Sequence, residues 1–329
     1  MNRYKSLILT LIAATMALAA SAQTDPQMGQ LYRVKTQYNP AAVGMDDYIN
    51  INGGARLQWV GIDGAPQSFL VTGDMPFKFL GKRFGTGVVI RQESIGLFNS
   101  LNIGAQIAFK LRKFGGEFTG GLQVGLFDQS FKGSEVFLPD GDDYHQGTDD
   151  AIPTTDIHGS SLDLSAGLWY QRPRWGVGVS MTHITGSTIK MGGENSGTSG
   201  SDSEQIYEFK ADRTLYLIGE CNIPIKNTLF EILPALLVKT DFTFYTGELT
   251  ARARYNKFLS FGLGYRWDDA VIATIAAELK NFYLGYSYEY STGAIHSASS
   301  GSHEFVIGYR LKLNLGAQNK HRHRSIRIM

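Results

Sequence analysis

The chain has 329 residues, with 31 Lys and Arg against 30 Asp and Glu, so its formal net charge is +1. A near-neutral chain lacks the basic face that nucleic-acid binding needs, and a hydrophobic share of 43% excludes global disorder. The single cysteine, Cys221, excludes an internal disulfide framework. Charged residues reach only 19%, whereas 38 residues are glycine and 12% are aromatic, which favours an all-β chain such as a membrane barrel.

The first 22 residues have the pattern of a secretory signal peptide. Arg3 and Lys5 precede an apolar run over 7–20, and the small residues of 20–22 form a cleavage site. We therefore expect an exported mature chain that begins at Gln23. No later stretch offers 18 consecutive apolar residues, so a membrane-spanning form would cross with strands.

The body of the chain alternates between apolar and polar residues with the period of a β-strand. In 281–290, Phe282 and Leu284 share one face with three tyrosines, and Glu289 lies on the other. The inward positions Arg252, Arg254, Arg310 and Glu289 either line a pore or form an ion network that fills it.

The pattern predicts about fourteen strands of bilayer-spanning length. They are expected near 48–59, 66–76, 84–94, 100–111, 116–130, 159–171, 175–184, 207–222, 228–239, 241–254, 258–266, 270–279, 281–290 and 302–314. Short turns fall at even-numbered connections, and the long segments 131–158, 185–206 and 291–301 fall at odd-numbered ones. This sorting predicts a transmembrane antiparallel β-barrel with short periplasmic turns, long extracellular loops and periplasmic termini, rather than a soluble β-sandwich.

The predicted barrel over 48–314 is flanked by two further segments. Residues 23–47 form a periplasmic N-terminal segment, which is a linker, a plug or a docking segment. Residues 315–329 form a basic periplasmic tail. Its cations are candidates for contact with an acidic partner or an anionic headgroup. These cations are Lys320, Arg322, Arg324 and Arg327.

No pattern in the chain predicts catalysis, a cofactor site or a metal site. The histidines are scattered, and neither a Gly-x-Ser-x-Gly nor a His-Glu-x-x-His motif occurs. The loop 131–158 is rich in aspartate but lacks the full calcium-loop pattern, so a solvated acidic loop is expected and calcium binding is the alternative.

Distinct short motifs occur at the two ends of the chain. Near the start, they are Asp25-Pro26-Gln27, Tyr38-Asn39-Pro40-Ala41 with Gly44, and the nonapeptide 58–66. Near the end, they are 301–305 and the following 307–310. With these motifs the chain resembles the PorP/SprF family of outer-membrane proteins of the Bacteroidetes type IX secretion system. The family-matching positions are Asn39, Pro40, Ala41, Gly44, Gln58, Trp59, Gly61, Asp63, Gly64, Pro66, His303, Phe305 and Tyr309.

The resemblance implies a barrel without enzymatic activity that works in protein secretion and gliding motility. Its relatives associate with periplasmic ring proteins of the PorK and PorN type, with a peptidoglycan-binding protein, or with one large surface adhesin, beside the outer-membrane lipids. Two other hypotheses remain. The first is an outer-membrane channel or transporter for small solutes or hydrophobic substrates, and the second, disfavoured by the missing motifs, is an outer-membrane hydrolase.

Overall fold

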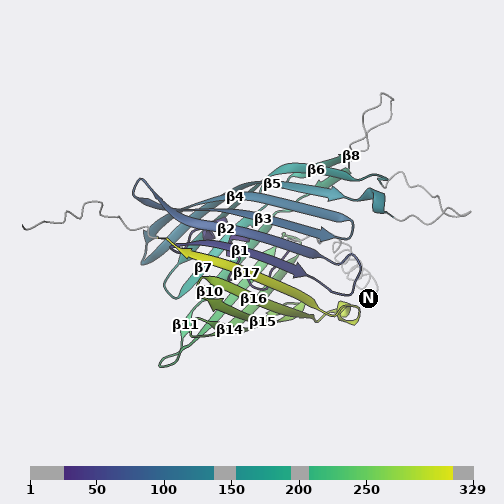
Figure 1. Cartoon of the computed structure of the whole chain (residues 1–329). Helices are drawn as coiled ribbons and strands as arrows, with labels where there is room; N and C mark the ends of the chain where they lie inside the picture. Colours follow the sequence, from purple (N-terminus) through teal and green to yellow (C-terminus); the bar gives the residue numbers. More distant parts are fainter. Residues whose placement is uncertain (1–25, 137–152, 194–206, 314–329) are drawn as a thin grey trace, which may run out of the picture.

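The computed structural model describes residues 26–136, 153–193 and 207–313, which form a closed antiparallel β-barrel (Figure 1). Fourteen strands make the wall, as the sequence predicts. The first wall strand pairs with the second and also with the last, so the sheet has no free edge. The wall strands are β1 (Tyr48–Leu57), β2 (Gln67–Phe79), β3 (Lys82–Ile95), β4 (Phe98–Lys113), β5 (Gly116–Phe131), β6 (Ile157–Gln171), β7 (Trp175–Thr182), β10 (Thr214–Cys221), β12 (Phe230–Thr240), β13 (Tyr245–Tyr255), β14 (Leu259–Arg266), β15 (Ala270–Leu279), β16 (Phe282–Ser291) and β17 (Ser302–Lys312).

Seven shorter elements accompany the wall. Two of them form a hairpin beside β6, one continues the line of β10, and four are single 3₁₀ turns. They are β8 (Thr188–Gly193), β9 (Tyr207–Lys210), β11 (Ile223–Pro224), η1 (Lys35–Gln37), η2 (Pro40–Ala42), η3 (Gly133–Glu135) and η4 (Ala294–Ser297).

Alternation along each strand sets which side chains face the lumen. In β16, Tyr283 and Glu289 are buried, whereas Phe282, Leu284 and Tyr290 are exposed on the outer surface. Exposed outward-facing apolar side chains recur on the other wall strands. Such a surface suits hydrocarbon, because lipid-facing and lumen-facing residues alternate in a membrane barrel.

The two ends of the barrel differ in their connections. At one end, here the turn end, short turns follow β2, β4, β6, β11, β13 and β15, and β1 begins and β17 finishes there. The opposite end, here the loop end, carries the long connections 58–66, 132–156, 183–213 and 292–301, together with three short ones.

The structure corrects one predicted strand. The segment 207–222 is two strands, because β9 pairs with β8 and β10 pairs with β7. β8 lies in the predicted long loop 185–206, and its Ile189 and Met191 pack against lumen-facing Phe127 and Ile157. Packing of this apolar cluster draws β9 to β8 and so separates β9 from β10. Such a tertiary effect cannot be read from the periodicity of the sequence.

In the described part of the chain, no helix has the length and apolar character needed to cross a membrane.

Candidate functional site: a plugged lumen

Residues 26–47, here called the plug, lie inside the barrel and wind around its inner wall. The plug starts at the loop end, where Gln27 Nε2 donates to Glu248 Oε2 at 2.7 Å. Lys35 Nζ lies 2.8 Å from a carboxylate of β10, and η2 packs against β4, β5, β6 and β7. The plug finishes at the turn end, where Asp47 pairs with Arg83. Of the interpretations that the sequence left open for this segment, its contacts are those of a plug.

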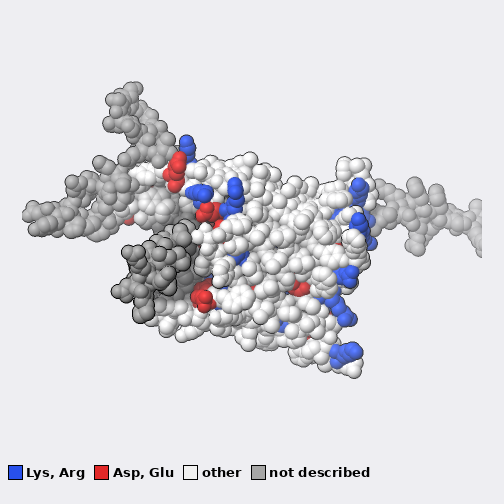
Figure 2. Space-filling model, turned by 180° about the vertical axis from the view of Figure 1, so that it is seen from behind, with Lys and Arg blue, Asp and Glu red and all other residues white. Residues whose placement is uncertain are grey.

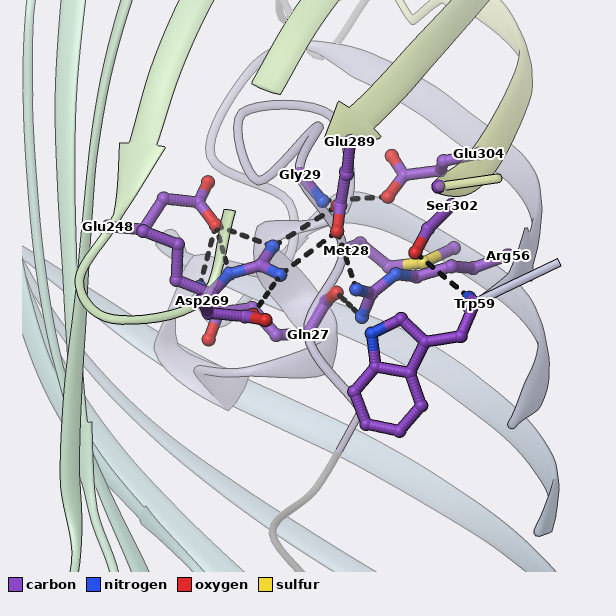
Figure 3. A network of polar contacts seen from close by, with 12 residues as sticks. Gln27, Met28, Gly29, Arg56, Trp59, Glu248, Asp269, Glu289, Ser302 and Glu304 are labelled. Atoms are coloured by element: carbon purple, nitrogen blue, oxygen red, sulfur yellow. Dashed lines mark hydrogen bonds and ion pairs between the residues drawn. The ribbon is translucent and has the colours of Figure 1, made fainter. Parts of the chain in front are cut away.

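A buried ion network lies where the plug begins (Figure 3). The Arg266 guanidinium is 2.8 Å from Glu248, 3.0 Å from Glu289 and 2.9 Å from Asp269. Arg56 Nη2 lies 2.6 Å from Glu289. Removing one member would leave an uncompensated buried charge, which costs about 3–5 kcal/mol.

The same network holds the backbone of the plug. Arg56 Nη1 donates to the carbonyl of Gln27 at 2.6 Å. The backbone N–H of Gly29 donates to the Glu304 carboxylate at 2.7 Å (Figure 3). The N–H of Gln30 donates to the same carboxylate at 3.0 Å. Hydrogen bonds to a charged partner are stronger than neutral ones, so Arg56 and Glu304 of the wall fix the backbone at the start of the plug.

Further along, aromatic and cationic groups join the plug to β13 and β16. The hydroxyl of Tyr32 is hydrogen-bonded to that of Tyr283, which donates to Gln30 Oε1 at 2.6 Å. The guanidinium carbon of Arg252 lies 3.0 Å from the centroid of the Tyr32 ring, and that of Arg33 lies 4.7 Å from the Tyr283 ring. These cation–π contacts add to the hydrogen bonds across the lumen.

The four inward charges singled out from the sequence therefore have partners. Glu289 belongs to the ion network, Arg252 covers Tyr32, Arg254 pairs with a glutamate of β12, and Arg310 pairs with Asp46 of the plug. Of the two alternatives, Glu289 fits the ion network. Arg252, Arg254 and Arg310 each have a partner but also line a cavity of about 260 Å³ that remains toward the turn end.

The family-matching Asn39 seats the middle of the plug. Its Oδ1 accepts from Ala41 N at 2.8 Å and so caps η2, where Pro40 is the first residue. Its Nδ2 donates to two wall carbonyls, those of Leu168 and Val179, at 3.1 and 3.4 Å. One side chain thus shapes the turn and fixes it to β6 and β7.

Wall glycines make this close approach possible. A Cβ added at Gly85, Gly121 or Gly167 would lie closer than 3.0 Å to the plug. At Gly121 the obstructing atoms are backbone atoms of Pro40 and Ala41, which no rotamer change could move. The high glycine content is thus partly explained by a wall shaped to the plug.

Gly44 sits where the plug leaves η2. Its φ of +60° favours glycine, and an added Cβ would meet the carbonyl of Met75. Its N–H donates to Asp74 Oδ2 at 2.8 Å, and its carbonyl accepts from the Lys110 ammonium.

The family-matching nonapeptide forms the first connection at the loop end. Gln58 N donates to the carbonyl of Pro66 at 2.9 Å and closes it, while Gly61 and Gly64 have φ values of +103° and +70°. Trp59 also has positive φ, and its N–H donates to Ser302 Oγ at 3.1 Å. Asp63 is exposed in this connection.

Residues from the two ends of the chain meet there. Val60 N donates to the carbonyl of Gly301 at 2.8 Å, and Ser300 N donates back to Val60 at 2.8 Å. The two motifs behind the resemblance thus lie side by side, 240 residues apart in sequence.

The other family-matching positions lie on the outer face of β17. His303 Nδ1 is 2.8 Å from the hydroxyl of Tyr286, whose ring centroid is 5.0 Å from that of Phe305. Tyr309 pairs with Phe282 at 4.9 Å. These residues form cross-strand aromatic contacts and do not join the lumen network.

Two predicted features fall largely outside the described residues. These are the tail cations Lys320, Arg322, Arg324 and Arg327 and most of the aspartates of 131–158. The described Asp156 accepts from Ser134 Oγ at 2.6 Å and from Ser134 N at 3.1 Å, and these bonds lower the pKa of its carboxyl. Within the described residues, no group of three or more His, Cys, Asp and Glu could hold a metal ion.

Sequence reasoning missed most of the residues that hold the plug. Arg56, Glu248, Arg266 and Glu304 are charged residues at inward positions of otherwise apolar strands. Alternation is a usable signal for such residues. It indicates Glu289 in β16, the strand next to the one that carries Glu304. Which charges pair across the lumen depends on strand order around the barrel, which alternation does not encode.

Comparison with protein families identifies the chain. The family model described as "Type IX secretion system membrane protein PorP/SprF" matches residues 20–309. The chain belongs to the PorP/SprF family. No curated protein sequence matches it.

The chain is similar to solved structures of outer-membrane proteins at low sequence identity. The Ralstonia pickettii toluene transporter TbuX has a TM-score of 0.50 at 11% identity, over 86% of this chain and 94% of that one. A Pseudomonas aeruginosa FadL homologue has a TM-score of 0.48 at 10% identity, over 84% and 93%. The Acinetobacter baumannii outer membrane protein Omp33 has a TM-score of 0.45 at 9% identity, over 82% and 100%. Together with the family match, the fold makes this PorP/SprF protein an outer-membrane β-barrel.

Proposed function

We propose that this PorP/SprF protein is a non-enzymatic barrel of the type IX secretion and gliding machinery that acts by binding other proteins. It binds periplasmic ring components, or it anchors or supports the secretion of a cell-surface adhesin. The observation that carries the proposal is a lumen filled by the chain's own plug, in a barrel whose family works in secretion. A barrel filled in this way is better suited to a scaffold than to an open solute pore.

The turn end faces the periplasm in this proposal, because outer-membrane barrels keep their short turns there. The basic tail, with Lys320, Arg322, Arg324 and Arg327, then lies on the side of the ring components and offers them a positive contact. The described start of the plug lies toward the loop end, since Gln27 contacts Glu248 there. We therefore place only the tail, and not the start of the plug, on the periplasmic face.

Affinity purification tests the proposal. A tag inserted after Gly197 allows native complexes to be extracted in mild detergent and identified by mass spectrometry. Recovery of ring lipoproteins would indicate the core machinery, and recovery of one large adhesin would indicate a dedicated attachment barrel. A barrel recovered alone that conducts ions in planar bilayers would overturn the proposal in favour of the channel hypothesis.

Two tail variants test the role of the tail. K320Q/R322Q/R324Q/R327Q removes four charges, whereas K320R/R322K/R324K/R327K keeps them. We expect the first to lose periplasmic partners and the second to keep them, and we expect added salt to lower partner recovery by the two charged chains, the wild type and the second variant. Equal recovery from both variants would exclude the tail charges as the contact.

A further inference from the structure

The turn end of the barrel carries an exposed cation in every one of its turns. Figure 2 shows Lys and Arg gathered at this end, whereas acidic and basic residues are mixed at the other. The six residues used here, called the turn-end rim, are Lys82, Lys113, Arg174, Lys226, Lys257 and Lys280. They come from the turns after β2, β4, β6, β11, β13 and β15, so they encircle the barrel.

These cations are not neutralised by described acidic residues. No carboxylate of a described residue lies within ion-pair distance of any of the six. The acids nearby have other partners: Asp47 pairs with Arg83, Glu117 with Lys110, and a glutamate of β12 with Arg254. The rim thus presents positive charge outward.

Exposed apolar side chains share the same turns. Leu80 is 83% exposed at the β2–β3 turn and Phe114 is 73% exposed at the β4–β5 turn. Lys113 Nζ lies 5.1 Å from the centroid of the Phe114 ring, and Lys82 Nζ lies 5.6 Å from that of Phe109. Tips this apolar are unfavourable in water, but they suit the interface of a bilayer, where a lysine extends its ammonium toward the headgroups.

The short connections at the loop end provide an internal comparison. They also expose aromatic residues, Phe242 and Trp267. Their charged residues, however, are Asp241, Asp268 and Asp269, and neither they nor the strand residues that flank them include an exposed Lys or Arg, since the flanking Arg266 is buried. Aromatic residues are therefore exposed in the short connections at both ends of the barrel, as expected of the two membrane interfaces. Exposed cations accompany them at the turn end only.

We propose that the turn-end rim is a binding surface for anionic phospholipid headgroups. Each turn has an exposed apolar side chain in it or directly beside it, which enters the bilayer, together with a cation at the depth of the headgroup phosphates. This pairing repeats around the circumference, where lipid surrounds the barrel. A protein partner would cover one sector and would not call for apolar tips on every side.

Lipid selectivity of the reconstituted full-length chain tests the proposal. The rim variant K226Q/K257Q/K280Q neutralises three neighbouring turns, and the control K132Q/K190Q/K210Q removes three lysines at the loop end, two of which have acidic partners there. Spin-labelled phosphatidylglycerol and phosphatidylcholine report which lipid the barrel surface retains. Heat-modifiable migration on gels confirms that each variant is folded.

The wild-type chain and the control should prefer phosphatidylglycerol, and salt should weaken the preference. Since one cation near an anionic surface changes affinity about fivefold, the rim variant should lower the preference at least about fivefold. A folded rim variant with wild-type lipid preference would overturn the proposal. If that variant instead lost binding to polyaspartate-coated beads, the rim would be a docking surface for an acidic protein and the lipid proposal would be wrong.

Discussion

The seat of the plug on β5 gives a sharp test, because two adjacent glycines face opposite sides of the wall. Gly121 faces the lumen, where a Cβ would overlap the backbone of Pro40 and Ala41. Gly120 faces the lipid, and its nearest obstacle is a Leu168 methyl group at 3.7 Å. Valine at the first position should therefore displace η2 from the wall, and valine at the second should not.

The size of the effect follows from the contacts around η2. Overpacking costs about 1–3 kcal/mol. Displacement also breaks the two hydrogen bonds from Asn39 Nδ2 to the wall and the 2.7 Å bond from Ser180 Oγ to the carbonyl of Tyr38. At about 1 kcal/mol each, these three bonds hold η2 on the wall by about 3 kcal/mol, and the overpacking strain of about 1–3 kcal/mol offsets much of that stabilisation.

Conductance and proteolysis measure the displacement. In planar bilayers, G121V should give frequent open events, and thermolysin should cut it within residues 36–45. G120V should resemble the wild-type chain in both assays. The reasoning would be refuted if a folded G121V barrel stayed closed and resistant to protease, or if G120V opened equally.

Three further outcomes are expected. R266M leaves Glu248 and Glu289 without the guanidinium that they share. It should lower the free energy of unfolding, measured by urea titration in lipid vesicles, by about 3–5 kcal/mol. Unchanged stability would show that the network does not stabilise the barrel. N39A removes the cap and both wall contacts and should cost about 2–3 kcal/mol in the same titration, whereas a loss below 0.5 kcal/mol would contradict the assigned contacts. In a C221S background, a membrane-impermeant maleimide should label G61C on intact cells and K257C only after permeabilisation; the reverse pattern would invert the orientation of the barrel.

The wall of the barrel is readable from the sequence because each strand carries its own signal. Outward Leu284 is apolar and inward Glu289 is charged. Because lipid-facing and lumen-facing positions alternate along every strand, this difference in polarity shows which way each side chain points. The plug carries no such local signal. Gln27 finds its partner 221 residues away in Glu248, and Asn39 finds carbonyls of two wall strands. Contacts of this kind depend on barrel closure, so periodicity could indicate inward charges but not what they hold.

The direction of the plug limits how a partner could act on it. Its first contacts, from Gln27 to Gln30, lie at the loop end, and its last, through Asp46 and Asp47, lie at the turn end. A protein at the turn end therefore meets the junction between plug and β1, not the start of the plug. Force applied at that junction acts first on the ion pairs with Arg310 and Arg83, which are partly exposed, and only later on the buried network around Arg266. Exposed pairs contribute about 0–1 kcal/mol, whereas breaking a buried pair costs about 3–5 kcal/mol. A partner bound at the turn end could therefore move the turn-end half of the plug, while the loop-end half stays fixed.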